Sequence, residues 1–494
     1  MSRPEAGNAL LLVGPQYFDN RLPISSISRR VLERTDPLGI GIVSAVLKKH
    51  GLKTHLEIMR PGHINDLQSY IEAAGSVFIS SRFYDTSSAQ EAIRIANKAG
   101  KTVITGGYGP TLDPASFDRS TAIVQGEAEP VLDQLVDDLK SGHLEPVYDS
   151  TKLPPFDLDQ YIWPDRSIYP RPGFGIPKKH SQELARGCEE GHCIFCSGVQ
   201  LQRTFRSRDS RDTIAEIESM GIRKSDFLFF VDLNTFSVPR ERLVPLFTYL
   251  KQNRIKWISE GTVAPLLADL EQCGKDDSLL ALMSPQDGLG GCYSFLYGAD
   301  DLISTRVKGS RDKEKTMLAQ TVKVFSEFGI PLNLSVVVGL DNHTFPDSFF
   351  QIADTLREIR APYTFFHIAT PYPGTVWGDK VSQQGRVTDL DSTHFNHRRV
   401  VAAPKNMSAD ELQQGYFWLQ RKLYNPGEIA ETFKAHHRKR SPNVVLDAFS
   451  SGLPFAVDTF LSNLELDARG FVDHRALRNL DEGYTRWKSA SHEN

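Results

Sequence analysis

Short apolar runs alternate with amphipathic segments along the amino-terminal part of the chain. The apolar runs have the length of strands and lie at 9–13, 53–59, 76–82 and 101–107. Between them, residues 36–51 and 87–100 carry apolar positions at helical spacing, and Gly51 follows basic residues at the end of the first of these segments. Strands that alternate with helices at this pace predict a parallel sheet with helices on both faces.

Three loops are expected at the carboxyl ends of these strands, where parallel sheets bind their ligands. They span residues 80–88, 106–111 and 126–130. Glycines such as those at the start of the second loop let the backbone approach a flat or anionic ligand closely. Glycine is also common in tight strand-to-helix turns, so both interpretations stay open from the pattern alone.

The alternation stops at residues 149–179, which carry six prolines and several aromatic residues. This composition predicts an ordered linker that lies on a surface. A second alternation follows, with a first strand expected at 182–187. Further strand-like runs lie at 227–236, 255–262, 292–301, 330–340 and 363–375. About six β/α units predict a partial barrel whose active site lies at the carboxyl ends of the strands.

Beyond residue 393 the pattern becomes helical. Residues 407–425 form an amphipathic segment, with Ser408 placed as its N-cap and Glu411 three residues later. The chain is therefore predicted to be an α/β protein in four parts. These are a doubly wound Rossmann-like domain over 1–148, a linker over 149–180, a partial (β/α)6 barrel over 181–394 and a helix-rich domain over 395–494.

The composition is that of an ordinary globular enzyme. The 494 residues are 40% hydrophobic and 24% charged, and the net charge of −4 gives no indication of a nucleic-acid partner or an anionic membrane surface. No stretch approaches the roughly 18 apolar residues of a membrane-spanning helix. Five cysteines, three of them clustered, make a poor disulfide framework, so a cytoplasmic protein is expected. Cys273 and Cys292 stand singly and are expected to pack as small hydrophobic side chains.

The other three cysteines form the pattern Cys188-x4-Cys193-x2-Cys196. Clustered thiolates bind soft metals, either zinc or an iron–sulfur cluster. A structural zinc site needs four ligands, and His192 is a candidate for the fourth. Its side chain is next to that of Cys193, however, and neighbouring side chains do not converge easily on one tetrahedral ion. Three thiolates instead suit a cubane cluster with one iron open for a ligand, which favours chemistry at that iron.

The segment LARGCEEGHCIFC, residues 184–196, resembles the cluster loop of radical S-adenosylmethionine enzymes, in the branch with an amino-terminal cobalamin-binding domain. In that branch an Arg-Gly-Cys opens the loop and a Cys-x-Phe-Cys closes it. The similarity continues in the same order through residues 36–51, 103–114, 123–139, 153–161, 229–236, 328–344, 370–375 and 398–416. Each segment is weakly specific, but their order makes the resemblance specific.

The chain departs from this family's pattern in two places. Four residues, instead of the usual three, separate Cys188 from Cys193, and Gly191 is expected to absorb the extra residue with a positive φ. The amino-terminal domain also lacks the Asp-x-His-x-x-Gly pattern that supplies a histidine to cobalt. The resemblance therefore implies that cobalamin binds without that histidine.

The resemblance implies three cofactors: a [4Fe–4S] cluster, S-adenosylmethionine and cobalamin. Three of the irons would be held by Cys188, Cys193 and Cys196. Contacts to S-adenosylmethionine would come from the cysteine loop and the barrel strands, at Phe195, Asp232, Asn234, Gly298, Asp300, Ser335, Gly339, Pro371 and Tyr372. Contacts to cobalamin would come from the strand-end loops, at Ser81, Tyr84, Thr86, Gly106, Gly107, Tyr108, Gly126 and Glu127.

Simpler structural roles stay open for some of these residues. Phe195 either packs on the adenine of the cofactor or only packs its own loop. Asp232 and Asn234 either meet the amino or ribose groups of the cofactor or cap the turn after their strand. Asp300 is shorter than the glutamate that the family usually has at the ribose-binding position.

The reaction implied by the resemblance is methylation of an unactivated carbon of a small molecule. A 5′-deoxyadenosyl radical would remove the hydrogen and methylcobalamin would supply the methyl group, while the protein positions the reactants and excludes water. An electron donor such as flavodoxin or ferredoxin is the expected protein partner. Two alternatives stay open: a radical S-adenosylmethionine cyclase or rearrangement enzyme in which cobalamin is absent or transfers no methyl group, and a zinc-stabilised binding protein without turnover.

Overall fold

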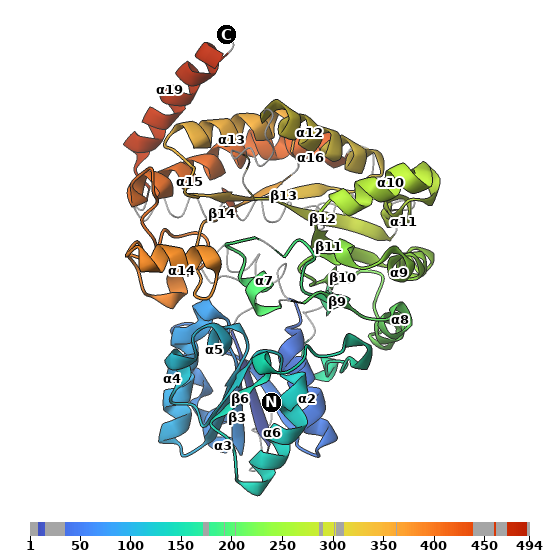
Figure 1. Cartoon of the computed structure of the whole chain (residues 1–494), viewed down its shortest axis with the longest axis vertical. Helices are drawn as coiled ribbons and strands as arrows, with labels where there is room; N and C mark the ends of the chain where they lie inside the picture. Colours follow the sequence, from blue (N-terminus) through green and yellow to red (C-terminus); the bar gives the residue numbers. More distant parts are fainter. Residues whose placement is uncertain are drawn as a thin grey trace.

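Two parallel sheets organise the part of the chain that the computed structural model describes (Figure 1). The described residues are 8–14, 35–170, 177–191, 193–202, 204–285, 290–300, 302, 311–361, 363–437, 459–460 and 472–491. The amino-terminal sheet has the strand order β2-β1-β3-β4-β5-β6, and the second sheet has the order β14-β13-β12-β11-β10-β7. The strands β8 (Ala185–Arg186) and β9 (Arg206–Ser207) form a separate antiparallel pair.

The amino-terminal sheet is covered by helices on both faces. Its strands are β1 (Ala9–Val13), β2 (Thr54–Ile58), β3 (Ser76–Ser80), β4 (Thr102–Gly106), β5 (Ala122–Gln125) and β6 (Val147–Asp149). Its helices are α2 (Leu38–Lys49), α3 (Gln68–Ala73), α4 (Thr86–Lys98), α5 (Tyr108–Leu112) and α6 (Glu129–Ser141). Along β1, Leu11 packs with α2 and α6, whereas Leu10 and Leu12 pack with α3 and α4. The predicted doubly wound arrangement is confirmed.

The second sheet is a partial barrel. Its strands are β7 (Lys179–Gln182), β10 (Phe227–Phe230), β11 (Lys256–Gly261), β12 (Gly291–Asp300), β13 (Leu332–Val338) and β14 (Thr364–Ile368). The helices beside them are α7 (Ser197–Leu201), α8 (Ser210–Ser219), α9 (Arg240–Gln252), α10 (Ala264–Asp277), α11 (Leu279–Met283), α12 (Arg311–Glu327), α13 (Asp347–Glu358) and α14 (Val376–Gln383). All strand pairs are parallel, and β7 and β14 are the two edges of the sheet. Six β/α units and an open barrel were predicted, and both are confirmed.

The first barrel strand lies earlier than the sequence predicts. Instead of spanning 182–187, β7 ends at Gln182. The reason is the carboxylate of Asp232, which accepts hydrogen bonds from the backbone N–H groups of Leu184 (2.7 Å) and Ala185 (3.0 Å). These donors therefore leave the sheet ladder, and the chain turns away into β8.

The carboxyl-terminal part adds helices α15 (Ala409–Leu423), α16 (Pro426–His437) and α19 (His474–Ser491). Ser408 and Glu411 form the predicted capping box at the start of α15. This region packs on α13 through an aromatic cluster. The ring centroids of Phe350, Trp418 and Tyr484 lie 5.3–5.6 Å apart. The helix-rich extension predicted from the sequence is thus packed on the barrel.

The proline-rich segment between the sheets is ordered where it is described, because Leu158, Tyr161 and Tyr169 are buried in the core beside α2 and α6.

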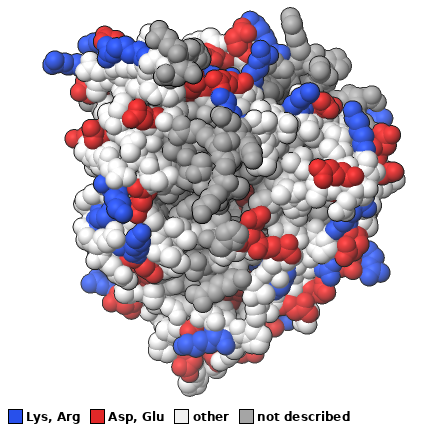
Figure 2. Space-filling model, turned by 45° about the horizontal axis from the view of Figure 1, so that its top comes forward, with Lys and Arg blue, Asp and Glu red and all other residues white. Residues whose placement is uncertain are grey.

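Basic and acidic side chains are interspersed on the face that Figure 2 shows. None of the described helices is both long and apolar enough to cross a membrane.

Candidate active site

The loops at the carboxyl ends of the two sheets meet. Phe83, in the short helix η2 (Phe83–Asp85) after β3, packs edge-on against Tyr372 and Phe395, with ring centroids 5.8 and 5.2 Å away. Gln202, after α7, donates a hydrogen bond to the hydroxyl of Tyr108 at 3.3 Å. Figure 1 shows α7 between the barrel and the amino-terminal domain. The strand-end loops predicted as ligand sites in both domains therefore face one another.

The cysteine loop depends on two glycines with positive φ. Gly187 has a φ of +86°, and a Cβ at this position would lie 2.6 Å from the carbonyl oxygen of Thr204. Gly191 has a φ of +47°, as predicted for the extra residue between the first two cysteines. The loop closes where the N–H of Cys196 donates to the carbonyl of Cys193 at 3.1 Å and α7 begins.

None of the three thiols of this loop is in a disulfide, and all three are half-buried. Burial raises the pKa of Cys196, and the charges of Cys188 and Asp300 add to the shift, so these groups lie near one another. No three His, Cys, Asp or Glu side chains among the described residues are gathered as a metal site, and His192 lies outside them. The donor chemistry nevertheless fits an iron–sulfur cluster, because one loop carries three soft ligands and no disulfide consumes them.

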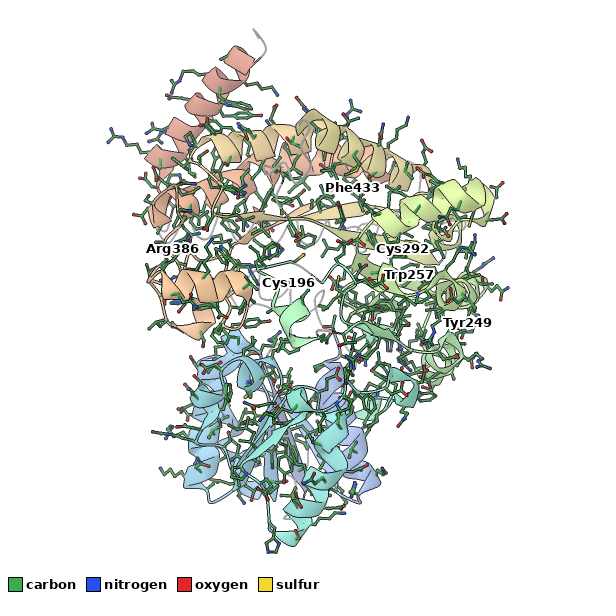
Figure 3. The ribbon with its side chains drawn as sticks, in the orientation of Figure 1. Cys196, Tyr249, Trp257, Cys292, Arg386 and Phe433 are labelled. Carbon is green, nitrogen blue, oxygen red and sulfur yellow. The ribbon has the colours of Figure 1, made fainter. Side chains whose placement is uncertain are left out.

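The other two cysteines lie apart from this loop. Cys292 is fully buried at the amino end of β12, and its thiol contacts the carbonyl oxygen of Ser294 at 3.5 Å. Cys273 in α10 contacts a carboxylate oxygen of Asp269 at 3.7 Å. Figure 3 shows Cys292 in the wall of the barrel, whereas Cys196 stands at the start of α7. The burial of Cys292 in the apolar core of the barrel supports its predicted packing role. Cys273 is half-buried and its thiol faces a carboxylate, so the packing role expected for it stays a prediction.

Asp232 and Asn234 organise the backbone after β10. Burial raises the pKa of Asp232 to about 7, although hydrogen bonds from two backbone N–H groups and the hydroxyl of Thr235 oppose the shift. Asn234 is the N-cap of η7 (Thr235–Ser237), and its side-chain nitrogen lies 3.1 Å from the hydroxyl of Thr262 and 3.9 Å from the sulfur of Cys188. The capping role is therefore present, and Asn234 also touches the cysteine loop.

Phe195 packs where the cysteine loop meets α14. It lies on an apolar cluster that includes Val337, Ala369 and Trp377. Beside it, the backbone N–H of Trp377 donates to the backbone carbonyl of Ile194 at 2.9 Å. The loop-packing role considered for Phe195 is thus present in the structure.

Residues on β12 and β13 form part of the inner wall of the barrel. Gly298 pairs in register with Ser335, which is half-buried. Asp300 lies at an irregularity of β12 and has a φ of +31°. Gly339 has a φ of +86°, and a Cβ there would lie 2.6 Å from Leu412, so this glycine allows α15 to pack closely on the strand end.

Tyr372 is directed toward the domain interface. Its hydroxyl donates to the carbonyl of Phe395 at 2.6 Å, so the same hydroxyl is the acceptor for the ring nitrogen of His397 at 3.3 Å. His397 itself has a φ of +63°, which is uncommon for a residue with a side chain. Pro371 is buried. The predicted contact of Pro371 and Tyr372 with S-adenosylmethionine stays a prediction.

Glycines in the amino-terminal loops let the loops pack on one another. Gly107 has a φ of +97°, and a Cβ there would lie 2.9 Å from the carbonyl oxygen of Ser81, whose N–H donates to Gly106 at 3.0 Å. Gly126 has a φ of +82°, and a Cβ there would lie 2.5 Å from the hydroxyl of Ser150. The tight-turn interpretation therefore applies to Gly107 and Gly126.

The remaining residues of the predicted cobalamin set differ in exposure. The ring of Tyr84 lies 4.4 Å from the guanidinium of Arg82. Thr86 is buried and donates to the carbonyl of Phe83 at 2.5 Å. Tyr108 is 43% exposed, whereas the other members of the set are buried or half-buried. Tyr108 thus offers the largest surface of the set to a ligand between the domains.

A buried ion-pair network ties the domains together beside the cysteine loop. Arg186 pairs with three carboxylates: Glu127 at 3.2 Å, Glu129 at 2.6 Å and Glu183 at 2.9 Å. Arg206 on β9 donates two hydrogen bonds to Glu127, at 2.8 and 2.9 Å. Burial alone would raise the pKa of Glu127, but the hydrogen bonds from Arg206 and the two positive charges outweigh it, so the pKa is lowered. Glu127, predicted to contact cobalamin, thus joins the two domains.

Three titratable residues near the site were missed by the motif analysis. Glu260 on β11 and His367 on β14 are half-buried, and the ring of His397 lies 5.5 Å from that of His367. Burial lowers the pKa of His367 to about 3 and that of His397 to about 4. Burial and the charge of Asp232 raise the pKa of Glu260 to about 7. For His367 the available signal was a polar residue within the apolar run of β14, whereas Glu260 lies on a strand of mixed polarity and His397 lies outside the strands.

Comparisons with known proteins agree with this arrangement. No protein-family model matches the chain. Bacteriochlorophyllide d C-12(1)-methyltransferase of Chlorobaculum tepidum is 25% identical over 418 residues, which are 80% of this chain and 83% of that protein. Among solved structures, the radical S-adenosylmethionine methyltransferase TsrM of Kitasatospora setae, with cobalamin and a [4Fe–4S] cluster bound, has a TM-score of 0.57 and 16% identity, covering 93% of this chain and 99% of its own.

The cobalamin-dependent S-adenosylmethionine radical enzyme OxsB, with aqua-cobalamin bound, has a TM-score of 0.53 and 13% identity, covering 98% of this chain and 84% of its own. TsrM has also been solved with a tryptophan substrate and an S-adenosylmethionine analogue. The cofactors found in these relatives are the three that the sequence predicts. The predictions of the fold and of an enzyme are confirmed. In fold the chain is similar to solved cobalamin-dependent radical S-adenosylmethionine enzymes, and in sequence, along most of its length, it is similar to a bacteriochlorophyllide d methyltransferase.

Proposed function

We propose that the chain is a cobalamin-dependent radical S-adenosylmethionine methyltransferase that methylates an unactivated carbon of a small molecule. The observation that carries this proposal is the meeting of two strand-end sites: the cysteine loop of the barrel faces the loops after β3, β4 and β5 of the doubly wound domain. A reaction that needs one ligand from each domain requires this juxtaposition. The methyltransferases among the relatives support the reaction type.

The groups would be held on opposite sides of this interface. Cys188, Cys193 and Cys196 would hold a [4Fe–4S] cluster, with S-adenosylmethionine against the inner wall of β12 and β13. Cobalamin would lie on the loops after β3, β4 and β5, where Tyr108 is exposed toward the cysteine loop. When bound, these groups supply a reductively generated carbon radical and a transferable methyl group.

The chain's own residues close and orient the space between the domains. Phe83, Tyr372 and Phe395 form an aromatic seal on one side, with ring centroids 5.2–6.2 Å apart. The ion pairs of Glu127 with Arg186 and Arg206 close the other side. Such closure excludes water and holds reactants in one geometry, and both effects protect a radical and favour its transfer to the intended carbon.

The substrate is proposed to be a small molecule, and the electron donor a protein such as flavodoxin or ferredoxin. Relatives include methyltransferases of bacteriochlorophyllide d and an enzyme solved with tryptophan, so the type of reaction is shared by acceptors of very different size. The fold therefore supports the reaction type, while the acceptor is a matter for the loops of this chain.

The test is anaerobic reconstitution of the purified chain with iron, sulfide and hydroxocobalamin. We expect about four irons and one corrinoid per chain, reductive formation of 5′-deoxyadenosine, and transfer of label from [methyl-13C]S-adenosylmethionine to the corrinoid. Replacing Cys188, Cys193 and Cys196 together by Ala should abolish iron binding, whereas Cys292→Ala should not. Because the cobalt-ligating motif is absent, the cob(II)alamin form should lack nitrogen superhyperfine splitting in electron paramagnetic resonance.

Two other results would replace the proposal. Formation of 5′-deoxyadenosine without corrinoid binding would assign the chain to radical cyclisation or rearrangement. Stoichiometric zinc without iron after reconstitution would assign it to a metal-stabilised binding protein.

A further inference from the structure

A histidine stands on the inner wall of the barrel, on its edge strand β14. Along this strand, Phe366 and Ile368 are buried in the core that also receives side chains of α12 and α13. Because side chains alternate along a strand, His367 points to the opposite face, into the barrel. It is half-buried and pairs in register with Val337, which belongs to the apolar cluster that Phe195 of the cysteine loop contacts. His367 therefore lies on the part of the wall that the cysteine loop approaches.

A second histidine, His397, connects this wall to the amino-terminal domain. Its carbonyl oxygen accepts the N–H of Ile368 at 2.7 Å, and its ring lies 5.5 Å from that of His367. Its Nε2 lies 3.3 Å from the hydroxyl of Tyr372, whose ring packs edge-on against Phe83 of η2. A ligand that reaches His367 would therefore lie between the cysteine loop and the amino-terminal domain, where the proposed function requires the acceptor.

The surroundings of the two rings are cationic. Burial lowers the pKa of His367 to about 3, and the charges of His397 and the half-buried Arg398 add to the shift. In the described part of the chain, no carboxylate forms an ion pair with either histidine, and neither ring nitrogen of His367 makes a hydrogen bond. His394 differs, because the carboxylate of Asp389 binds its ring at 2.7 Å. A partly buried polar group without a partner costs free energy unless a ligand supplies one.

On this geometry we propose that His367 and Arg398 bind a carboxylate group of the acceptor molecule. The inference rests on the proposed function and adds the chemical class of its acceptor, an anion. The single positive charge of Arg398 matches the single negative charge of a carboxylate, and the N–H of the neutral ring of His367 donates to one of its oxygens. His397 is a positioning residue, because its Nε2 already binds the hydroxyl of Tyr372.

The same face of β14 also offers apolar surface. Phe365 precedes His367 by two residues, so its half-buried ring lies on the inner face as well, and it pairs in register with Ser335. The carboxylate is therefore expected on a molecule with an apolar body, which the ring of Phe365 would contact.

The experiment measures equilibrium binding of 3-phenylpropionate and of its neutral amide, 3-phenylpropionamide, to the reconstituted protein. Saturating S-adenosylmethionine is present, so that neither probe is bound in place of that cofactor. For the wild type, the carboxylate should bind about tenfold more tightly than the amide, which corresponds to about 1.4 kcal/mol. His367→Phe and Arg398→Met should each remove most of this preference, whereas Arg398→Lys keeps the charge and should retain most of it.

Two neighbouring residues provide matched controls. Arg399 is 57% exposed and lies 3.8 Å from a carboxylate oxygen of Asp389, and His394 is bound by the same carboxylate. Arg399→Met and His394→Gln should therefore leave the preference for the carboxylate at its wild-type value. Iron content and near-ultraviolet circular dichroism verify that each variant is folded.

The outcomes separate this inference from the proposed function. If the wild type does not bind S-adenosylmethionine, the proposed function fails. If it binds S-adenosylmethionine but shows no preference for 3-phenylpropionate, or binds neither probe, the carboxylate site is wrong and the proposed function stands. A preference that survives in both His367→Phe and Arg398→Met also overturns the site, because the carboxylate is then bound elsewhere. Loss of the preference in these two variants alone, with both controls unchanged, is the result that supports it.

Discussion

Removing the carboxylate of Glu127 is expected to loosen the domain interface. In Glu127→Gln, both hydrogen bonds from Arg206 lose their charge assistance and only one side-chain oxygen still accepts. The guanidinium then has neutral acceptors alone: this amide oxygen and the carbonyls of Phe156 (2.8 Å) and Thr204 (3.2 Å). Arg186 is less affected, because Glu129 and Glu183 still bind it.

The magnitude follows from the burial of the pair. The side chain of Glu127 is 18% exposed and that of Arg206 is 15% exposed, so solvent screens the charge left behind only weakly. Breaking one partner of such a buried pair costs about 3–5 kcal/mol, and the remaining neutral acceptors reduce this to about 2–4 kcal/mol. The double variant with Arg206→Met removes the stranded charge. It should therefore be less destabilised than the sum of the single variants, by about 1–3 kcal/mol.

The assay is native-state hydrogen exchange of the amides in the loop at 126–130 and in the cysteine loop, which reports the free energy of opening the interface directly. The matched control is Glu91→Gln, which breaks the solvent-exposed pair of Glu91 with Arg94 on α4. Protection of both loops should fall in Glu127→Gln and stay unchanged in the control. If the two variants lose protection equally, or if the double variant is additive, the network does not hold the domains together.

The sign of the pH dependence is also determined. The folded-state pKa of Glu127 is lowered from the ordinary value of 4.5, so its stabilisation is fully present above that value. The stabilisation is lost as the pH falls through the lowered pKa. Glu127→Gln should therefore differ most from the wild type at neutral pH and least in acid.

Three further predictions concern other parts of the site. Burial lowers the pKa of His367 to about 3 and that of His397 to about 4, so NMR should find both rings neutral from pH 8 down to pH 5. Below pH 6.5 the unfolded chain binds protons that the folded rings refuse, so the free energy of unfolding should fall with the pH. A ring that titrates near 6.5 would contradict the burial. The raised pKa of Asp232, about 7, means that its charge destabilises the fold as the pH rises from 3.8 through 7, so Asp232→Asn should flatten this decline in urea unfolding; an unchanged pH profile would refute it. Gly339→Val should destabilise the packing of α15 by about 2–4 kcal/mol, because its side chain meets Leu412 at a positive φ. The control is Gly39→Ala in α2, where a Cβ meets no atom within 4 Å, and it should keep or slightly raise the melting temperature. If Gly339→Val does not melt below the wild type, α15 accommodates the larger side chain.

Much of the architecture could be predicted from local pattern. The length of an apolar run and its alternation distinguish strands from helices without any distant contact, and β1, with Leu10 and Leu12 on one face and Leu11 on the other, is an example. The capping box at Ser408 and the positive φ of Gly191 could also be predicted from the sequence, because each depends only on neighbouring residues of the chain. Cysteine spacing indicated soft-metal chemistry for the same reason.

Roles that depend on packing were decided only by the tertiary structure. The end of β7 at Gln182 is set by Asp232, a residue of the next barrel strand's loop, which captures two N–H groups that local pattern assigns to the ladder. Glu127 looked like a ligand residue by position and is an ion-pair partner of two arginines from the other domain. Glu260 carries no motif at all. Whether a polar group is paired or left free depends on which residues, far apart in sequence, the fold brings within hydrogen-bonding distance, and no local pattern contains that information.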